Sequence, residues 1–243
     1  MSELPEDHGP SMTDSPAVPL LLLFDIDGTL LRYGGAVEHA AALIQALRDV
    51  YEVNLPDDAV RRVGPWGKTD QRIAREVLEA AGRSDFDERR DEWLERTWAV
   101  FQEVDLSRLA DGAMPGAAET LAWARDAGHQ NALLTGNAEP IAYRKLEAAG
   151  LGEWFARGQG AFGSDAEDRR ELVPVARERA GSWPASRSVV IGDAPGDVEC
   201  ALAGGALAVA LLGHFGRQEL NGADVFIERL TDLRGALAGL RSA

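Results

Sequence analysis

The sequence is poor in cysteine and in basic residues, and each shortage excludes a class of protein. A single cysteine, Cys200, rules out an internal disulfide and is typical of a reducing compartment, so we predict a cytoplasmic location. The 25 lysines and arginines are outnumbered by 40 acidic residues, which gives a net charge of −15. Surfaces that bind nucleic acid or anionic membranes need clustered basic residues, so we expect neither partner.

Long hydrophobic runs are missing as well. No stretch approaches the roughly 18 apolar residues of a membrane-spanning helix. The first residues, MSELPEDHGPSMTDSPAVP, have neither the basic start nor the apolar centre of a secretory signal. Their proline, serine and acidic content predicts a disordered leader over residues 1–18.

What the sequence does contain is an alternation of strand and helix patterns. Strand patterns lie near residues 20–24, 131–137 (with a turn), 161–162, 188–191, 207–211 and 225–227. Helical patterns at 116–127, 139–149 and 170–180 separate several of them, which predicts an α/β fold with a doubly wound, Rossmann-like parallel sheet.

A second group of helical patterns follows the first strand without any strand between its members. These patterns cover residues 36–50, 57–63, 70–81 and 86–104. We therefore expect a Rossmann-like catalytic core at 19–34 and 111–243, with a helical cap inserted at 35–110.

The first strand pattern, LLLLFDIDGTLL at residues 20–31, runs directly into two aspartates. Residues i and i+2 of a strand point the same way, so Asp25 and Asp27 can face one spot. Two like charges at ~4 Å cost about 4 kcal/mol at an effective dielectric near 20. A bound cation or acid–base work would explain such a pair. The alternative is a turn in which Asp27 and Gly28 only cap the next element.

Polar residues also follow the later strands. Thr135, Gly136 and Asn137 follow the second strand, and Asp193 and Asp197 follow the strand at 188–191. Parallel strands bring their carboxyl ends to one edge of a sheet, so these residues should meet Asp25 and Asp27 there. A basic pair, residues 169–170, stands before the preceding helix. Oxygen ligands favour Mg²⁺, and the hydroxyl, amides and arginine suit a phosphoryl group.

DIDGT, LLTGN, the basic pair and GDAPGD together resemble the four motifs of the haloacid dehalogenase (HAD) superfamily, across residues 20–230. The order and the helical insert are similar to its capped phosphatases, such as phosphoglycolate phosphatases. The resemblance implies that Asp25 is the nucleophile that forms an aspartyl-phosphate, and that Asp27 is the general acid and base. It also implies Mg²⁺ held by Asp25, the Asp27 backbone carbonyl and Asp193, with Asp197 supporting a metal-bound water.

The resemblance further implies that Thr135 and the amides that follow, at Gly136 and Asn137, bind the phosphoryl group, beside Gly28 in the first motif. The third motif usually holds a lysine, but this chain has only Lys68 and Lys145. Lys145 lies in the expected helix soon after the second motif, too early to serve. We therefore expect Arg169 in that role, with Arg170 as the alternative, although arginine has a different hydrogen-bond geometry.

Other signals are weaker. GPWGKT at residues 64–69 lacks the first glycine and the preceding strand of a P-loop. It resembles instead a cap segment that faces substrate, which makes Lys68 and Thr69 candidate substrate-binding residues, although Lys68 could equally be a solvated loop charge. GQGAFG at 158–163 fits a dinucleotide motif but not its strand-to-helix context. The four scattered histidines, residues 8, 39, 129 and 214, are expected at the surface, and Trp93 and Trp98 in the cap core.

The sequence therefore predicts a Mg²⁺-dependent phosphomonoester hydrolase that acts on a small phosphorylated metabolite. Haloacid dehalogenation is the nearest rival, although that branch lacks the second aspartate of the first motif. Phosphomutase chemistry shares every motif, and phosphonate cleavage would need Lys68 as a Schiff-base lysine. A catalytically silent binding relative is a further alternative, which the intact Asp25, Asp27 and Asp193 disfavour. The substrate itself and the oligomeric state stay open.

Overall fold

The sheet at the centre of this computed structural model is parallel throughout and has the strand order β3-β2-β1-β4-β5-β6. The structure describes residues 18–33 and 35–240, so the predicted leader lies outside the described residues apart from Val18. Within them the strands are β1 (Leu21–Phe24), β2 (Gln130–Leu134), β3 (Gly160–Ala161), β4 (Ser188–Gly192), β5 (Leu207–Leu211) and β6 (Val225–Ile227). The predicted doubly wound, Rossmann-like fold is confirmed.

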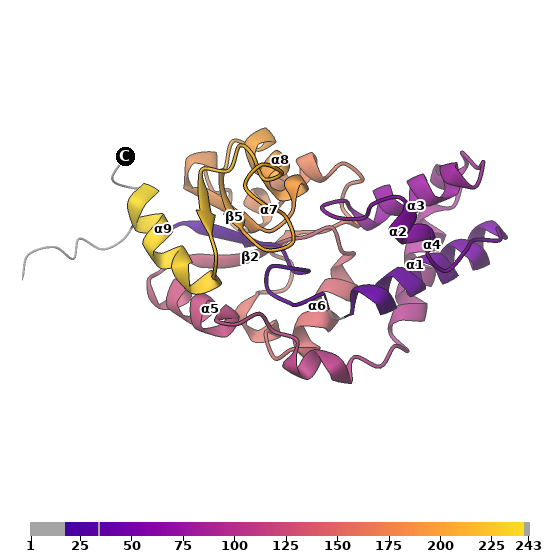
Figure 1. Ribbon diagram of the computed structural model, residues 1–243, viewed down its shortest axis with the longest axis horizontal. Coiled ribbons are helices and arrows are strands. Elements are labelled where there is room, and N and C mark those ends of the chain that lie inside the picture. The colour runs from indigo at the N-terminus through magenta and orange to yellow at the C-terminus, as the bar shows by residue number, and fades with distance from the viewer. Residues whose placement is uncertain (1–17, 34, 241–243) are drawn as a thin grey trace, which may run out of the picture.

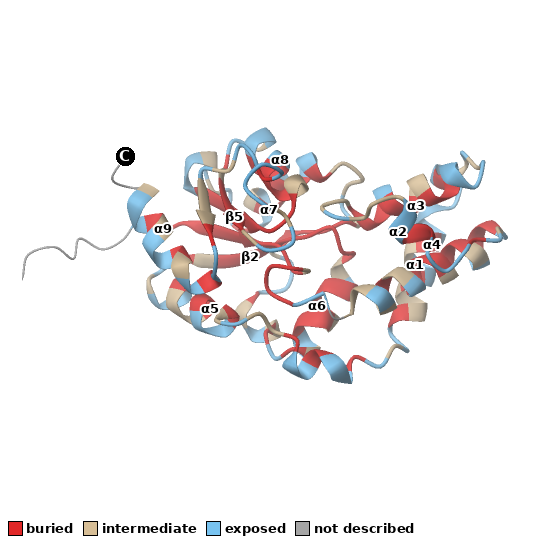
Figure 2. Ribbon diagram, viewed as in Figure 1, coloured by how far each residue is buried: buried red, intermediate tan, exposed pale blue. Residues whose placement is uncertain are grey.

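Helices cover both faces of this sheet (Figure 1). On one face lie α5 (Ala117–Asp126), α6 (Glu139–Ala148) and α9 (Leu233–Leu240), and on the other lie α7 (Leu172–Arg179) and α8 (Pro195–Ala203). Leu22 and Phe24 of β1 point into the first cluster of buried side chains, and Leu21 and Leu23 point into the second. The apolar run at residues 20–24 is thus explained, because both faces of β1 are buried; Figure 2 shows most of the sheet in the colour of buried residues.

The remaining long helices lie between β1 and β2 and stand to one side of the sheet in Figure 1. They are α1 (Ala36–Tyr51), α2 (Ala59–Arg62), α3 (Asp70–Ala80) and α4 (Arg90–Phe101). They share a separate cluster of buried apolar side chains, in which Trp93 is fully buried, as expected. Trp98 differs from expectation, because it is partly buried and packs against the first cluster, beside the sheet. Among the described residues, no helix combines the length and the apolar composition that crossing a membrane requires.

Two helices differ in extent from the sequence prediction. The helix expected at residues 86–104 is a 3₁₀ turn followed by α4, because Arg89 has a φ of −132° and interrupts the helical backbone. The helix expected at 170–180 begins with a 3₁₀ turn, in which the backbone N–H of Arg170 donates to the capping Asp168 side chain. The 3₁₀ turns of the described chain are Phe86–Glu88, Ser107–Asp111, Gly152–Trp154, Arg169–Glu171, Ala185–Arg187 and Leu230–Asp232.

Candidate active site

Three carboxylates meet at the carboxyl edge of the sheet. Phe24 at the end of β1 is level with Leu133 of β2 and Ile191 of β4, so the residues that follow these strands lie side by side. As a result, one carboxylate oxygen each from Asp25, Asp193 and Asp197 lies within 4.8 Å of the others, and all three residues are buried. The side chain of Asp27 is not part of this group. The structure thus brings together residues that are 172 positions apart at the extremes (197 minus 25).

This cluster carries more negative charge than its surroundings offset. Burial and the charge of Asp197 raise the pKa of Asp25 to about 7, although Arg169 opposes the rise. Burial and the charge of Asp25 raise the pKa of Asp193 to about 6. Burial also raises the pKa of Asp197, against the neighbouring guanidinium of Arg169. Three crowded carboxylates of this kind are the oxygen donors that a hard divalent cation takes, so the residues fit Mg²⁺.

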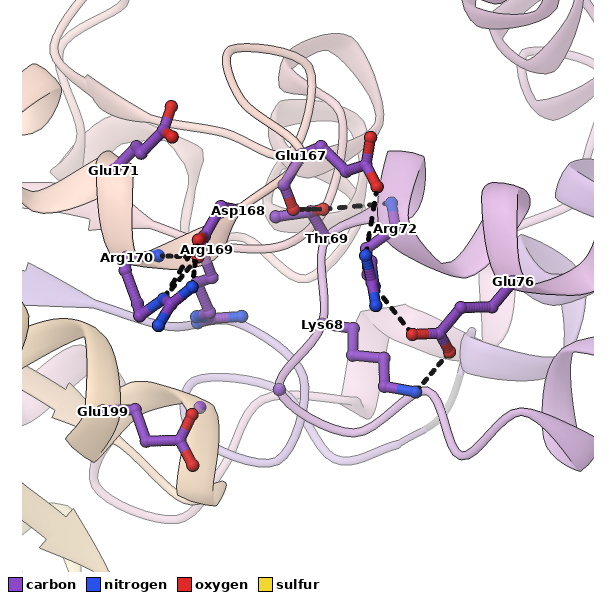
Figure 3. A pocket seen from close by; sticks show the side chains of 12 residues that line it. Lys68, Thr69, Arg72, Glu76, Glu167, Asp168, Arg169, Arg170, Glu171 and Glu199 are labelled. Atoms are coloured by element: carbon purple, nitrogen blue, oxygen red, sulfur yellow. Dashed lines mark hydrogen bonds and ion pairs between the residues drawn. The ribbon is translucent and has the colours of Figure 1, made fainter. Parts of the chain in front are cut away.

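The two candidate arginines point in different directions. Arg169 is only 8% exposed, and its Nη2 lies 2.9 Å from Oδ1 of Asp25 and 2.5 Å from Oδ1 of Asp197. The Arg170 side chain is 65% exposed and forms an ion pair with Asp168 at the rim (Figure 3). Both residues belong to the 3₁₀ turn at Arg169–Glu171, from which their side chains project to different sides. Of the pair, the structure therefore places Arg169 at the carboxylates.

Asp27 is held by a different set of side chains. Its Oδ2 accepts hydrogen bonds from Nζ of Lys145 at 2.7 Å and from Nδ2 of Asn137 at 2.9 Å. The same Asn137 amide group donates to Oγ1 of Thr135 at 2.7 Å, which joins the turn after β2 to Asp27. The second oxygen, Oδ1 of Asp27, is buried and has no hydrogen-bond partner among the described residues. Such an atom is free to accept a hydrogen bond from an O–H group of a bound molecule.

The sequence excluded Lys145 only from the third-motif role, which its position agrees with, but gave it no other place in the site, and it has one. Lys145 projects from α6, is 0% exposed, and also donates to Oδ1 of Asn137 at 2.7 Å. It lies at Asp27, not at the Asp25–Asp197 pair where Arg169 lies. A signal was available, because Lys145 takes one position of a buried helical stripe that otherwise holds Ala138, Ile141, Ala142, Leu146 and Ala149.

Lys145 changes the chemistry of Asp27. Burial alone would raise the pKa of this carboxyl, but the charge and the hydrogen bond of the Lys145 ammonium outweigh burial. Together with the Asn137 amide they hold the pKa of Asp27 below its usual range. The two aspartates of the first motif therefore have pKa values shifted in opposite directions, which is typical of paired acid–base groups with separate roles.

The cap also contacts this network, through His39 of α1. Its Nδ1 lies 3.2 Å from Nζ of Lys145, and its Nε2 lies 3.0 Å from Oδ2 of Asp70, the first residue of α3. The backbone N–H of Ala138 donates to the same Asp70 oxygen at 2.8 Å. The prediction that His39 lies at the surface is wrong, because docking of α1 and α3 against the core buries it.

The other histidines differ in how far they are buried. His129 is buried, against expectation, because it accepts the N–H of Leu20 at 3.2 Å beside β1. His214 is exposed as expected, and His8 lies outside the described residues.

Two glycines of the predicted motifs permit close approach. Gly28 has a φ of +91°, and a Cβ atom there would lie 2.3 Å from Oδ2 of Asp193. A Cβ atom on Gly136 would lie 2.0 Å from the backbone oxygen of Lys68. Any larger residue would force apart the first motif from Asp193, or the cap loop from the turn after β2.

The two predicted cap residues point their polar groups elsewhere. Nζ of Lys68 donates to Oε2 of Glu76 at 2.5 Å and to the oxygen of Val63 at 2.6 Å, as Figure 3 shows for the glutamate. Oγ1 of Thr69 donates to the backbone oxygen of Glu167 at 2.6 Å and caps α3. The structure therefore does not bring either side chain to Asp25, although both residues line cavities near it.

Sequence reasoning also missed Tyr33. Its hydroxyl donates to Oδ2 of Asp193, while Oγ1 of Thr29 lies 3.3 Å from the other oxygen of that carboxylate. Nothing in the pattern of residues 28–33 indicates this contact, because Asp193 is 160 residues away in the chain.

Two cavities lie on either side of the Gly67–Lys68 segment. The larger, about 980 Å³, is lined by Asp25, Asp27, Asn137 and Asp193 at its floor and by cap helices above. The smaller, about 600 Å³, is lined mainly by charged residues, and Figure 3 shows their ion pairs. Arg169 borders both. The large cavity is of a size that binds small organic ligands.

Comparisons with known proteins agree with this geometry. The model of the haloacid dehalogenase-like hydrolase family matches residues 22–202. A phosphoglycolate phosphatase of Pseudomonas putida is 28% identical over 228 residues, which covers 91% of this chain and 80% of that protein. A phosphoglycolate phosphatase of Pseudomonas fluorescens is 30% identical over 200 residues, covering 80% of this chain and 70% of that one. The crystal structure of a hydrolase from Pseudomonas syringae superposes with a TM-score of 0.65 at 24% identity, covering 91% and 99%.

Proposed function

This chain belongs to the haloacid dehalogenase-like hydrolase family, and from that premise we propose that it is a Mg²⁺-dependent phosphatase of small phosphorylated metabolites. The relatives at 28% and 30% identity are named phosphoglycolate phosphatases, which supports phosphomonoester hydrolysis as the reaction. The observation that carries the proposal is the grouping of Asp25, Asp193 and Asp197 within 4.8 Å, beside an Asp27 in a different electrostatic environment.

In the proposed first step, a carboxylate oxygen of Asp25 attacks phosphorus and the bond to the alcohol oxygen breaks. The product is an aspartyl-phosphate, a covalent intermediate of a kind that carboxylates form. The leaving alcohol takes a proton from Asp27, whose buried and otherwise unpaired Oδ1 is the atom available for it. An incoming phosphate adds negative charge beside Asp27, which raises the pKa of that carboxyl towards the protonated form that the step needs.

In the second step, water hydrolyses the intermediate. Asp27, now a carboxylate beside the Lys145 ammonium, takes a proton from the water as it attacks phosphorus. Phosphate leaves and Asp25 is restored. The lowered pKa of Asp27 in the free site suits this base role, because it keeps the group ionised at neutral pH.

The surrounding residues bind and orient. Thr135 and the backbone amides of Gly136 and Asn137 are proposed to hold phosphoryl oxygens, and Arg169 to neutralise charge that builds on them. Asp25, Asp193 and the Asp27 backbone carbonyl would hold Mg²⁺, with Asp197 in a supporting position, and the ion would supply further positive charge for the phosphoryl group. Gly28 lets the first motif approach Asp193. Lys145 acts as a positioning residue that holds Asp27 through its Oδ2.

Lys68 and Thr69 are still proposed to lie next to the substrate, but to face it with their backbone atoms. Their side-chain polar groups are bonded to Glu76 and to Glu167. The close packing of the Lys68 oxygen over Gly136 supports that position.

The proposal is tested by measuring phosphate release from a panel of phosphate monoesters, with millimolar Mg²⁺ and with EDTA. We expect turnover that needs the metal and is abolished by Asp25→Asn. Release of halide from 2-haloacids, with no phosphate released from any ester, would falsify the proposal in favour of dehalogenation.

A further inference from the structure

Part of the wall that lines the large cavity is apolar, and this part meets the carboxylates at Tyr33, whose hydroxyl donates to Asp193. Val37, Trp66 and Tyr33 line it, and they are 77%, 45% and 40% exposed. In the described part of the chain, five large apolar residues are exposed and not merely partly buried: these three, Val18 and Leu202. Ala41, Ile44, Val100 and Val104 continue the same wall. Exposed apolar side chains gathered in one cavity mark a ligand surface.

Three of the four lysines and arginines that line this cavity already have partners. Nη2 of Arg48 donates to Oδ1 of Asp57 at 2.6 Å and also contacts the oxygen of Leu55. Lys68 is held by Glu76, and Arg169 by Asp25 and Asp197.

The fourth, Arg61, is exposed, and within the described chain no acid forms an ion pair with it, because the nearby Asp58 pairs with Arg62. Glu38 and Asp70 add negative charge to the lining, Glu38 as the partner of Arg108. A second anionic group on the substrate, such as a carboxylate, therefore has no buried cation to bind and meets acidic side chains.

The aromatic part of the wall is held in place. The Trp66 ring stacks on His214, with 5.6 Å between centroids and 21° between planes. Tyr33 meets the same imidazole edge-on at 6.1 Å. A ring fixed by such contacts loses little side-chain freedom when a ligand packs against it. The cavity volume of about 980 Å³ also exceeds the needs of a two-carbon acid and lies at the upper end for small-molecule sites.

We propose that the alcohol released by this site is neutral and apolar, with an aromatic ring or a branched chain, and that it lies against Val37 and Trp66. This rests on the proposed phosphatase function and names its substrate class. Water replaces the alcohol at phosphorus: the bond from phosphorus to the alcohol oxygen breaks, the alcohol takes a proton, and the oxygen of the water ends in phosphate. Short phosphorylated carboxylic acids such as phosphoglycolate are poor substrates on this proposal.

The test compares kcat/KM for ethyl phosphate, 2-phenylethyl phosphate and phosphoglycolate. The first two release primary alkyl alcohols of similar reactivity, so a difference between them reports contacts with the cavity wall. We expect the phenyl ring to raise kcat/KM by about 10-fold to 100-fold, as burial of one large apolar group does. We expect phosphoglycolate to be no better than ethyl phosphate. A preference for phosphoglycolate over 2-phenylethyl phosphate overturns the proposal.

A charged residue in the wall provides the second measurement. Val37→Asp lies in the first turn of α1, where an added acid is compatible with the helix, so the variant should fold. We expect it to lower kcat/KM for 2-phenylethyl phosphate at least about tenfold and to change that for ethyl phosphate less than about threefold. Leu202→Asp places the same charge on an exposed apolar residue that lines neither cavity, and should change neither value.

An unchanged ratio between the two esters in Val37→Asp overturns the assignment of this wall. Failure of the phosphatase function itself has a different signature, because then none of the three esters releases phosphate in the unaltered protein.

Discussion

The ammonium of Lys145 lies 2.7 Å from Oδ2 of Asp27, although 118 residues separate the two along the chain. Lys145 is fully buried and the Asp27 side chain is 21% exposed, and Lys145 is the main reason why the pKa of Asp27 is low in spite of its desolvation. Replacement by methionine, Lys145→Met, keeps the length of the side chain and removes the charge. The pKa of Asp27 should then rise, because burial is no longer opposed.

In Lys145→Met we therefore expect the acidic limb of the pH–rate profile to move to higher pH. At about pH 6 the rate should fall at least about tenfold, with partial recovery at about pH 8, since a general base is worth roughly 10²–10⁴. Steady-state kinetics across this range measure it. Arg125→Met removes an exposed cation that lines neither cavity and should leave the profile unchanged. A pH profile that Lys145→Met does not move would remove Lys145 from its proposed role.

The melting midpoint gives an independent measure of the contact between Lys145 and Asp27. Removing one member of a buried ion pair typically costs about 3–5 kcal/mol, because the other charge is left unpaired. The double variant Asp27→Asn with Lys145→Met removes both charges and should melt higher than Lys145→Met alone. Thermal melts of the four proteins of this cycle measure the coupling.

Arg169 and Arg170 are adjacent in sequence, yet only the first contacts carboxylates of the site. Arg169→Ala removes a group that would stabilise charge in the transition state, for which losses of about 10²–10³ in kcat are typical. Arg170→Ala breaks an exposed ion pair with Asp168 and should change kcat less than about threefold. Measured kcat values for both variants decide the matter. A larger loss of kcat in Arg170→Ala than in Arg169→Ala would show that Arg170, and not Arg169, is the third-motif residue.

The carboxylate cluster should make stability depend on pH and on metal. The folded pKa values of Asp25 and Asp193, about 7 and about 6, lie above the ordinary value of 3.8. Between that value and the folded pKa the folded protein binds more protons than the unfolded chain, so these groups lower stability as pH rises from about 4 to about 7. Asp27 has a lowered pKa and contributes stability above about pH 4, which it loses on acidification.

With EDTA we thus expect a lower melting midpoint at about pH 7.5 than at about pH 5.5. Millimolar Mg²⁺ should raise the midpoint at the higher pH, by roughly 2–4 °C for each kcal/mol of binding, and less at the lower pH, where the carboxyls are protonated. Asp193→Asn should lose most of the Mg²⁺ response, and Asp168→Asn, outside the cluster, should keep it. A wild-type midpoint that ignores Mg²⁺ would exclude these carboxylates as the metal site.

Close packing at Gly136 gives a purely steric prediction. In Gly136→Ala the new methyl group would lie 2.0 Å from the oxygen of Lys68, so the cap loop has to move away. Overpacking of this kind costs about 1–3 kcal/mol, and we expect a lower melting midpoint together with a lower kcat/KM. Gly235→Ala is the control: nothing lies within 4 Å of its Cβ position in α9, and the helix should gain about 0.5–1 kcal/mol. Equal melting of the two variants would contradict the steric argument.

Much of the fold could be predicted from the sequence, because the strands carry local signals. The apolar run of β1 and the bounds of β5 and β6 match the structure closely, since each is short, buried and ended by turn residues. The meeting of Asp25, Asp193 and Asp197 follows from that prediction, because parallel strands end at the same edge.

Contacts between the cap and the core could not be predicted in this way. His39 of α1 and Lys145 of α6 are 106 residues apart and meet only in the folded chain. Helical periodicity predicts a helix over residues 36–50, which α1 confirms, but it cannot say what faces Val37. Lys145 did carry a signal, a charge within an apolar stripe, and such a residue is best interpreted as the partner of a buried acid.

The groups that would handle the phosphoryl moiety and the apolar wall come from different parts of the chain. Asp25 and Asp27 precede residue 34, and Thr135 through Asp197 follow residue 134, whereas most of the wall, from Val37 to Val104, comes from the segment between. Mutations that accumulate in that one segment can therefore alter which alcohols fit while the inherited reaction stays intact. Changes in substrate preference among related proteins are therefore expected mainly at residues 37–104. Relatives that catalyse the same reaction need not act on the same substrate.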